Sequence, residues 1–180
     1  LAMVNALVDS GLAATNIAHV NLHATGTPIG DEAEFKAILS LFGEEHLRKG
    51  NVRISATKSS TGHCLGASGA IEAIFTILAL RSGIAPATVG LSRPLSDILL
   101  GCASGELQDI SFSAEAKRYA AMSNSFGFGG TNASLVFRRH LLLKRVSSKP
   151  WFREDTCKFL YPQTEESLEM NKFTKNPKDN

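Results

Sequence analysis

Apolar positions recur with a helical period in some stretches of the chain and form short runs in others, which predicts alternating helices and strands. The clearest helical pattern follows residue 62, where Ile71, Ile74, Phe75 and Leu78 share one face. The expected helices cover residues 1–11, 32–42 and about 62–81, and the expected strands cover residues 17–22, 52–57, 106–112, 118–123 and 133–138. This alternation is consistent with an α/β fold.

The segments between these elements are polar or rich in glycine and proline. Residues 43–51 predict a polar turn with His46 at the surface, and residues 82–104 predict a surface loop. The last two strands are joined by the segment NSFGFGGTN, whose glycines indicate a tight turn with close backbone approach. Because this segment is too long for a simple hairpin, we expect it to have a role at a functional site.

Two histidines and a lysine lie in loops that follow predicted strands, where α/β folds usually handle ligands. His23 follows the strand over residues 17–22. Lys58 and His63 follow the strand over residues 52–57, just before a helix start rich in small residues. Free N–H groups at a helix N-terminus favour developing negative charge. This layout suits chemistry on a carbonyl if another group supplies the nucleophile.

Each candidate also has an ordinary structural explanation. Asp31 and Glu34 by themselves are best explained as a cap and a first-turn residue of the helix over residues 32–42. His19 is expected to be an exposed or hydrogen-bonded strand residue. Taken singly, His23 and His63 are more often structural than catalytic, so only their context assigns them chemistry.

Composition changes this picture little. The chain has 180 residues, 43% hydrophobic and 20% charged, which is ordinary for a soluble globular protein of one domain. A net charge of +2 gives no reason to expect nucleic acid or a membrane surface as a partner. No apolar run is expected to be long enough to span a bilayer. The cysteines show neither metal-ligand spacing nor disulfide density, which indicates a reducing compartment; they are Cys64, Cys102 and Cys157.

The two ends of the chain differ from its middle. The sequence begins with Leu1, not Met, and with a helical pattern already under way, so we expect a fragment of a longer protein. After about His140 the periodicity is lost and Lys, Asn and Glu become frequent, so we expect residues 140–180 to be a disordered or loosely attached tail.

Four motifs occur in order along the chain: NLHATGTPIGDEAE, SATKSSTGHCLGASGAIEA, LALRSGIAPAT and MSNSFGFGGTNASLVF. Together they resemble the C-terminal half of a beta-ketoacyl-acyl-carrier-protein synthase, an elongating condensing enzyme of fatty acid synthesis. The resemblance covers residues 1–139 and implies a thiolase-like α/β fold, with a mixed β-sheet packed between helices. This chain would be the second half without its first strand, and residues 140–180 have no counterpart in the family.

In this family an acyl group is held on a cysteine, malonyl-acyl-carrier protein loses carbon dioxide, and the resulting carbanion attacks the acyl thioester. The resemblance implies that His23 and His63 contact the malonyl thioester oxygen and that Lys58 supports them. Neutral imidazoles suit this role because each offers one N–H donor. A donor placed where negative charge develops is worth about 3 kcal/mol.

The resemblance also implies substrate contacts and a cation network. Thr25 and Thr27 would bind the phosphopantetheine arm, and Phe128 would be an aromatic gate in a loop that moves. The other residues implied at that loop are Phe126, Gly127, Gly129 and Gly130. A network that holds potassium or sodium in some members matches Asn21, Glu34, Glu72, Ser123 and Asn124.

No cofactor is implied as a requirement. The implied partners are acyl carrier protein, with its phosphopantetheine-linked acyl and malonyl groups, and a second copy in a homodimer; nucleic acid and membranes are not expected. The compartment is left open between the bacterial cytosol, a mitochondrion and a plastid.

The nucleophilic cysteine of the family belongs to the other half of the enzyme, and no cysteine here replaces it. Cys64 follows His63 but is expected to pack as a small apolar residue. We therefore expect this chain to be inactive alone. We also expect it to be poorly soluble, because the sheet face and the central helix that meet the other half would be bare.

Three alternatives remain open. A thiolase shares the pattern GHCLGASG, but it carries a second catalytic cysteine in the turn that reads NSFGFGG here. A polyketide-synthase condensing domain usually has proline after the aspartate of the first motif, whereas Asp31 is followed by Glu32. The third alternative, from another class, is a non-catalytic remnant with a binding or structural role.

Overall fold

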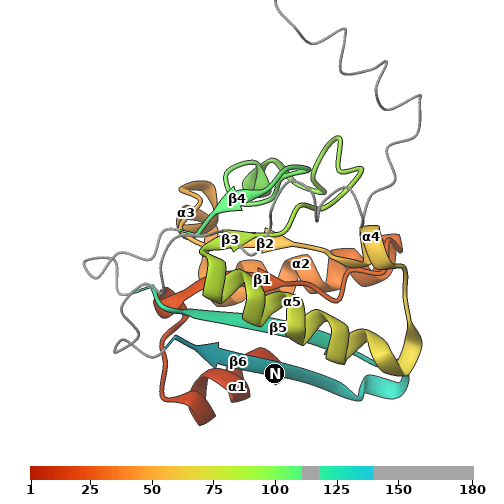
Figure 1. Ribbon diagram of the computed structural model, residues 1–180, viewed down its shortest axis with the longest axis horizontal. Coiled ribbons are helices and arrows are strands. Elements are labelled where there is room, and N and C mark those ends of the chain that lie inside the picture. Colours follow the sequence, from red (N-terminus) through yellow and green to blue (C-terminus); the bar gives the residue numbers. More distant parts are fainter. Residues whose placement is uncertain (111–117, 140–180) are drawn as a thin grey trace, which may run out of the picture. The chain divides into compact units, whose positions relative to one another are not determined.

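A four-stranded mixed sheet forms the centre of the computed structural model, which describes residues 1–110 and 118–139 (Figure 1). Its strand order is β2-β1-β5-β6. β1 (Ile17–Asn21) is parallel to β2 (Arg53–Ser55) and to β5 (Ala120–Phe126), whereas β6 (Asn132–Arg138) is antiparallel to β5. The carboxyl ends of β1, β2 and β5 therefore lie at one edge of the sheet.

Helices cover both faces of this sheet, so the predicted mixed sheet between helices is confirmed (Figure 1). α5 (Ser68–Ser82) packs on one face, over β1 and β5. α1 (Ala2–Ser10) and α2 (Pro28–Phe42) pack on the other face and share one hydrophobic core with the strands. The buried members of that core are Met3, Leu7, Ile17, Val20, Ile38, Phe42, Leu47, Val52, Ile54, Leu99, Cys102, Ala120 and Met122.

Short elements complete the described part of the chain. They are η1 (Ala14–Asn16), α3 (Glu44–Arg48), α4 (Lys58–Thr61), η2 (Leu65–Ala67), β3 (Ile84–Ala85), η3 (Asp97–Leu99), β4 (Gln108–Asp109) and η4 (Phe128–Gly130). β3 and β4 pair as an antiparallel ribbon. The described residues belong to one compact unit, and the predicted tail over residues 140–180 lies outside them.

α2 begins earlier than its sequence pattern predicts. The expected start was residue 32, capped by Asp31, but the helix begins at Pro28. Proline is favoured at a first helical position, because its φ suits the helix and its missing N–H has no partner there. The capping prediction for Asp31 is wrong: this side chain lies inside the first turn and accepts a hydrogen bond from the Gly26 N–H at 3.2 Å.

Residues 43–51 contain a short helix, α3, instead of the predicted polar turn. Leu47 is fully buried in the core and anchors the helix. The ion pairs Glu44–Arg48 and Glu45–Lys49 each join residues one turn apart. His46, expected at the surface, is half-buried and stacks on Phe42 with ring centroids 6.1 Å apart.

The segment before α5 is also more structured than expected. Lys58, predicted in a loop, starts the helical turn α4. α5 begins only at Ser68, after η2. The predicted close approach at the helix start is confirmed at Gly69, because a Cβ there would lie 2.9 Å from Ser125 Oγ on β5.

α5 turns its polar side chains toward the sheet. Ser68, Glu72 and Thr76 are buried, whereas Ile74 and Ile77 are 58% and 44% exposed. The outward face of the central helix is therefore bare, which is part of what we expected for this chain. The 18-residue window Leu65–Ser82 is also long and apolar enough to cross a membrane by length and composition, which corrects the expectation that no segment would be. Its buried polar face favours a core helix.

β5 and β6 form a hairpin, which the length of the NSFGFGGTN segment had argued against. Pairing extends to Phe126 and Asn132, so only five residues, 127–131, remain in the turn. The predicted loop over residues 82–104 contains β3 and η3, and its Leu99 and Cys102 are buried. The predicted strand over residues 106–112 is reduced to β4 among the residues described.

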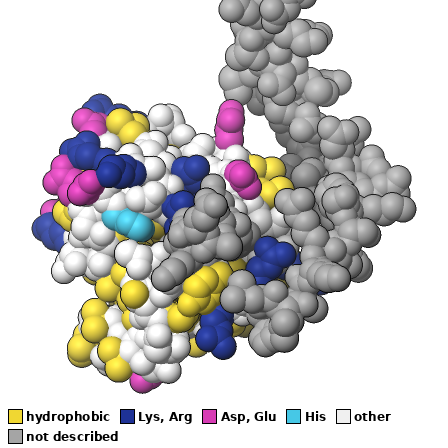
Figure 2. All heavy atoms as spheres, turned by 90° about the vertical axis from the view of Figure 1, so that its left-hand side faces the viewer, with side chains coloured by type: hydrophobic (Ala, Val, Ile, Leu, Met, Phe, Trp, Pro, Cys, Tyr) yellow, Lys and Arg dark blue, Asp and Glu magenta, His cyan; other side chains and the backbone are white. Residues whose placement is uncertain are grey.

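Charged side chains of both signs lie next to one another on the face in Figure 2. Most ion pairs in the described ranges are exposed and join residues one helical turn apart. Such exposed pairs add little to stability, because solvent screens them. One pair differs: Lys58 and Glu72 meet in the interior.

Candidate active site

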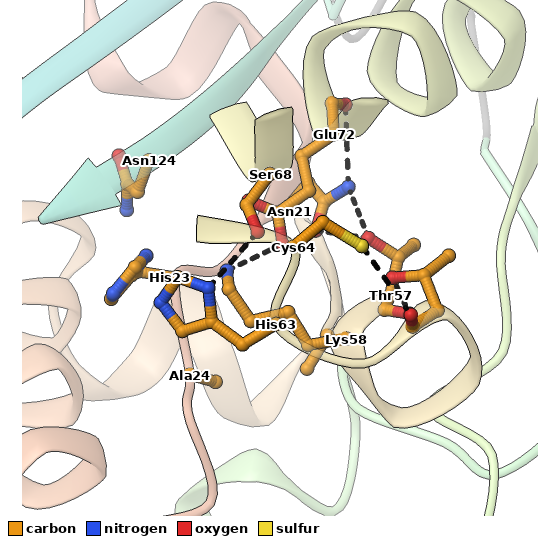
Figure 3. Close-up of polar contacts among 12 residues, drawn as sticks. Asn21, His23, Ala24, Thr57, Lys58, His63, Cys64, Ser68, Glu72 and Asn124 are labelled. Carbon is orange, nitrogen blue, oxygen red and sulfur yellow. Dashed lines mark hydrogen bonds and ion pairs between the residues drawn. The ribbon is translucent and has the colours of Figure 1, made fainter. Parts of the chain in front are cut away.

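Three predicted site residues meet at the sheet edge where β1, β2 and β5 end, and Figure 3 shows two of them, His23 and His63, side by side. His23 lies two residues beyond the end of β1, and Phe126 is the last residue of β5. His63 lies between α4 and η2, on the connection that leaves β2. The ring centroids of His23 and His63 are 5.4 Å apart, and those of His23 and Phe126 are 5.8 Å apart.

His23 is held in place by a buried carboxylate. Glu34 on α2 accepts hydrogen bonds from the backbone N–H groups of His23 at 3.0 Å and Ala24 at 2.8 Å. It also accepts one from Asn124 Nδ2 at 3.0 Å. Burial raises the pKa of Glu34, and these hydrogen bonds oppose the rise. Glu34 therefore fixes the turn that carries His23. From the sequence alone we had expected only a favourable charge in the first turn of the helix.

His23 is neutral near pH 7. Burial lowers the pKa of His23 to about 4, and the nearby Lys58 and His63 contribute to the drop, while Asp31 opposes it. A neutral imidazole carries one N–H and can donate a hydrogen bond without a full charge.

A buried ion pair lies beneath the two histidines. Lys58 Nζ lies 2.5 Å from Glu72 Oε1, and both side chains are at most 5% exposed. Burial raises the pKa of Glu72, and the hydrogen bond and charge of Lys58 oppose that rise. Removing one partner of such a pair costs about 3–5 kcal/mol, because the other charge is left buried alone.

The tautomer of His63 follows from a backbone contact. Its Nδ1 lies 3.0 Å from the backbone nitrogen of Leu65, which can only donate. Nδ1 must therefore carry the lone pair, and in the neutral ring the proton lies on Nε2. An N–H donor at Nε2 is what stabilisation of an enolate oxygen requires.

The predicted substrate-binding residues are only partly brought together. Thr25 and Thr27 are exposed, and their hydroxyl oxygens lie 3.0 Å apart. Thr25 also lines a cavity of about 310 Å³ beside His23, with Glu34 and Phe126. Phe128, the expected aromatic gate, is fully exposed.

The turn that carries Phe128 depends on its glycines. A Cβ on Gly127 would lie 3.0 Å from the Thr131 carbonyl oxygen. Gly129 and Gly130 have φ values of +75° and +82°, which favour glycine.

The five residues of the predicted cation network are buried at the same end of the sheet, and four of them form two hydrogen-bonded groups. In the first group, Asn124 donates a hydrogen bond to Glu34 and accepts one from Ser134 Oγ. In the second group, Asn21 donates to the backbone carbonyl of Glu72 at 3.4 Å. Ser123 lies opposite Asn21 in the sheet. The Ser123 hydroxyl and Glu72 Oε2 are buried without a hydrogen-bond partner, so both could ligate a small cation. Occupancy by potassium or sodium stays a prediction.

The described cysteines do not supply a nucleophile. Cys64 is exposed, so the prediction that it packs as an apolar residue is wrong; its sulfur only approaches the Thr61 carbonyl at 3.6 Å. Cys102 is fully buried in the core, and burial raises the pKa of its thiol to about 12. Cys157 lies outside the described residues.

Sequence reasoning did not single out Ser68, whose hydroxyl oxygen lies 3.1 Å from His63 Nδ1. A signal was present: a hydroxyl residue five positions after the histidine, at the first turn of the following helix. The start of α5 places Ser68 against the His63 ring, and sequence spacing alone does not specify this contact.

Comparisons with known proteins identify the family and the fold of this chain. The family model described as beta-ketoacyl synthase, C-terminal domain, matches residues 1–92. The chain is 49% identical over 137 residues to the mitochondrial 3-oxoacyl-acyl-carrier-protein synthase of Arabidopsis thaliana, covering 76% of this chain and 28% of that protein. It is 43% identical over 139 residues to 3-oxoacyl-acyl-carrier-protein synthase 2 of Vibrio cholerae, covering 77% and 32%.

Solved structures of ketosynthases show the same fold. A beta-ketoacyl synthase from Burkholderia phymatum superposes with a TM-score of 0.59 at 40% identity, covering 77% of this chain and 31% of that one. A type II polyketide ketosynthase, solved in complex with its acyl-carrier protein, superposes with a TM-score of 0.66 at 25% identity, covering 77% and 32%. The chain spans about a third of the length of the curated relatives it matches.

Proposed function

This chain belongs to the beta-ketoacyl synthase family, as its C-terminal domain, and we propose that it supplies the enolate-stabilising half of a condensing active site. The observation that carries the proposal is the edge-on pair of His23 and His63, 5.4 Å apart beside a buried Lys58. Two neutral donors and a fixed positive charge suit an oxyanion that forms during the reaction.

The reaction proposed is decarboxylative Claisen condensation in fatty acid synthesis. The C–C bond to the malonyl carboxylate breaks, carbon dioxide leaves, and the electron pair moves onto the thioester oxygen as an enolate. The N–H groups of His23 and His63 donate to that oxygen. The enolate carbon then attacks the acyl thioester, and the cysteine sulfur leaves as a thiolate.

Each donor in this scheme has its own support. The Leu65 amide places the His63 proton on Nε2. The lowered pKa of His23 keeps that ring neutral, with one N–H to donate. Lys58, neutralised in part by Glu72, provides positive charge without entering proton transfer. Thr25, on the wall of the cavity beside His23, would meet the phosphopantetheine arm.

We propose that the nucleophilic cysteine comes from the portion that the longer relatives have and the described residues do not contain. Cys102 is excluded by its burial and its raised pKa. Cys64 is next to His63 in the sequence. Its sulfur lies near the carbonyl oxygens of Thr61 and Gly62, at 3.6 and 4.0 Å, and carbonyl oxygens cannot stabilise a thiolate.

Acyl carrier protein is the proposed carrier of both substrates, because the relatives are named for it and a ketosynthase was solved bound to it. Fatty acid synthesis is favoured over polyketide synthesis by identities of 41–49% to curated 3-oxoacyl-acyl-carrier-protein synthases, against 25% to the type II polyketide ketosynthase structure. A homodimer and a structural monovalent cation, held by Ser123 and Glu72, belong to the same proposal.

A chimera tests this function directly. Residues 1–139 of this chain replace the matching C-terminal segment of the Arabidopsis relative, which supplies the remainder. We expect the chimera to form beta-ketoacyl product from acyl- and malonyl-acyl-carrier protein. His23→Ala and His63→Ala should each lower condensation about 100-fold or more, because each removes one oxyanion donor. Mass spectrometry should still detect acylated cysteine, since acyl transfer precedes enolate formation.

His46→Ala is the matched control, because this histidine packs on Phe42 away from the site and should leave turnover within twofold. Condensation that survives either site variant would contradict the assigned roles. A well-folded chimera that acylates its cysteine and yet never condenses would contradict the proposed function and favour the non-catalytic remnant.

A further inference from the structure

Ser68 occupies an unusual place for a serine at a helix start. It is the first residue of α5 and only 6% exposed. A serine near a helix N-terminus usually caps backbone N–H groups. Here the residue before the helix is Ala67, and no side-chain cap bond is made. The hydroxyl oxygen of Ser68 instead lies 3.1 Å from His63 Nδ1 (Figure 3).

The direction of this bond is fixed by its neighbour. Nδ1 of His63 already faces the Leu65 N–H at 3.0 Å, and a backbone N–H always donates. Nδ1 is therefore an acceptor, and Ser68 must be the donor. Two donors converge on one ring nitrogen, the Leu65 amide in η2 and the Ser68 hydroxyl in α5.

A second donor at Nδ1 would help to hold the His63 ring in one orientation. The ring is exposed, and it lies in a segment between two residues with positive φ, Gly62 at +70° and Leu65 at +50°. Leu65 is the only described residue other than glycine with positive φ, and L side chains rarely adopt that conformation. If the Leu65 amide were the only donor to the His63 ring, the ring would be held by a residue in an unfavourable backbone conformation.

We propose that Ser68 is a positioning residue for the condensation reaction: its hydroxyl donates to His63 Nδ1 beside the Leu65 amide and holds the ring in place in the Nε2–H tautomer that the amide selects. The proposal rests on the proposed function of His63 and adds a residue to it. Ser68 acts through His63 and need not touch substrate. The buried hydroxyl, anchored on a long helix, provides a fixed reference that the short turn lacks.

The first test reads the tautomer without any activity. In the 180-residue chain labelled with ¹⁵N-histidine, long-range ¹H–¹⁵N spectra separate Nδ1 from Nε2 in each of the five histidines. The His63 signals are those lost in His63→Gln. We expect the parent chain to show one neutral tautomer, with the proton on Nε2. Ser68→Ala should keep this tautomer but show a clear shift of the Nδ1 signal, because the Leu65 amide is then the one donor left, and Ser68→Thr should keep the parent signals.

Ser55→Ala is the matched control, because Ser55 Oγ lies 2.7 Å from Nε2 of another histidine, His19. It should move the His19 signals and leave those of His63 in place. Alanine is favoured in a helix, so Ser68→Ala is expected to fold. An Nδ1–H tautomer in the parent chain, or identical His63 signals with and without Ser68, would overturn the proposal.

The second test uses the chimera and separates kcat from KM. Ser68→Ala should lower kcat for condensation about 5- to 10-fold with KM nearly unchanged, and Ser68→Thr should restore most of it. A purely structural role would instead lower thermal stability and be rescued by any residue that packs, Ser68→Val included, because valine has the shape of threonine without its hydroxyl donor. If His63→Ala keeps its turnover, the proposed function fails, while the tautomer test still decides whether Ser68 positions the ring.

Discussion

His19 shows how far a single residue can depart from its ordinary behaviour inside this sheet. It has no exposed surface, and burial lowers the pKa of its ring to about 3. Its Nε2 lies 2.7 Å from Ser55 Oγ, and its Nδ1 has no partner. We had predicted that His19 would be either exposed or hydrogen-bonded. It is buried and hydrogen-bonded through Nε2 only. The ring does not belong to the candidate site, but it links stability to pH.

We predict that His19 makes the fold sensitive to acid. The unfolded ring takes up a proton near pH 6.5 and the folded ring only near pH 3, so the unfolded state binds more protons between these values. Stability contributed by neutral His19 is present above pH 6.5 and falls by about 1.4 kcal/mol for each pH unit below it. In His19→Gln, which can keep a bond to Ser55, the free energy of unfolding should depend less steeply on pH.

Urea unfolding at pH 7.0, 6.0 and 5.0 checks this. Burial raises the pKa values of Glu34 and Glu72, which acts in the opposite direction, but both carboxyl groups are present in parent and variant alike. The difference between the two pH profiles therefore isolates His19. Parallel profiles would show that the buried ring does not resist protonation.

At the scale of elements, α5 differs from an ordinary surface helix, because it has apolar side chains on both faces. Its polar side chains face the sheet, where Glu72 pairs with Lys58, and Leu80 is buried there as well. The apolar side chains of Ile74, Ile77 and Leu78 face outward. A helix with an apolar outer face needs a further surface to cover it.

We predict that this outer face drives self-association of the isolated chain. Ile74→Glu combined with Ile77→Glu should raise the fraction of monomer in sedimentation velocity and leave the fold intact, since both side chains are largely exposed. Leu80→Glu on the same helix is the matched control. That side chain is 6% exposed, so the substitution should cost about 2–5 kcal/mol of stability. Equal loss of stability in the two variants would mean that the outer face is not bare.

At the scale of the whole molecule, the described chain holds two donors and a positive charge but no competent thiol. Neither described cysteine is suited to be the nucleophile. Cys64 is exposed and has carbonyl oxygens near its sulfur, and burial raises the pKa of the Cys102 thiol. The chain also covers only about a third of the length of its curated relatives. We therefore propose that the histidine half of the reaction is present here without the half that carries the acyl group.

We predict that the purified 180-residue chain forms no beta-ketoacyl product from acyl- and malonyl-acyl-carrier protein, whereas the chimera does. Product is measured by mass spectrometry of the carrier protein, with a chimera lacking its acyl-accepting cysteine as the blank. Turnover by the chain alone, above that blank, would show that a cysteine within it can hold the acyl group.

Much of the fold and the identities of the candidate donors could be predicted from sequence. Strand and helix order followed from apolar periodicity, and His23, His63 and Lys58 stood out because they lie in short loops directly after strands. Errors gathered where a tertiary contact outweighed the local pattern. α3 forms because one residue, Leu47, reaches the core. The β5–β6 hairpin is tight because pairing continues through Phe126.

By itself, the sequence determined which side chains are candidates for the chemistry and which elements present them, because imidazole, ammonium and periodicity are local properties. Only the tertiary structure decided their electrostatic state. Burial and the approach of distant groups make His23 neutral, pair Lys58 with Glu72 and bring Glu34 against the turn at His23. It also decided which face of α5 is inside, since burial depends on what packs against a helix and not on the helix alone.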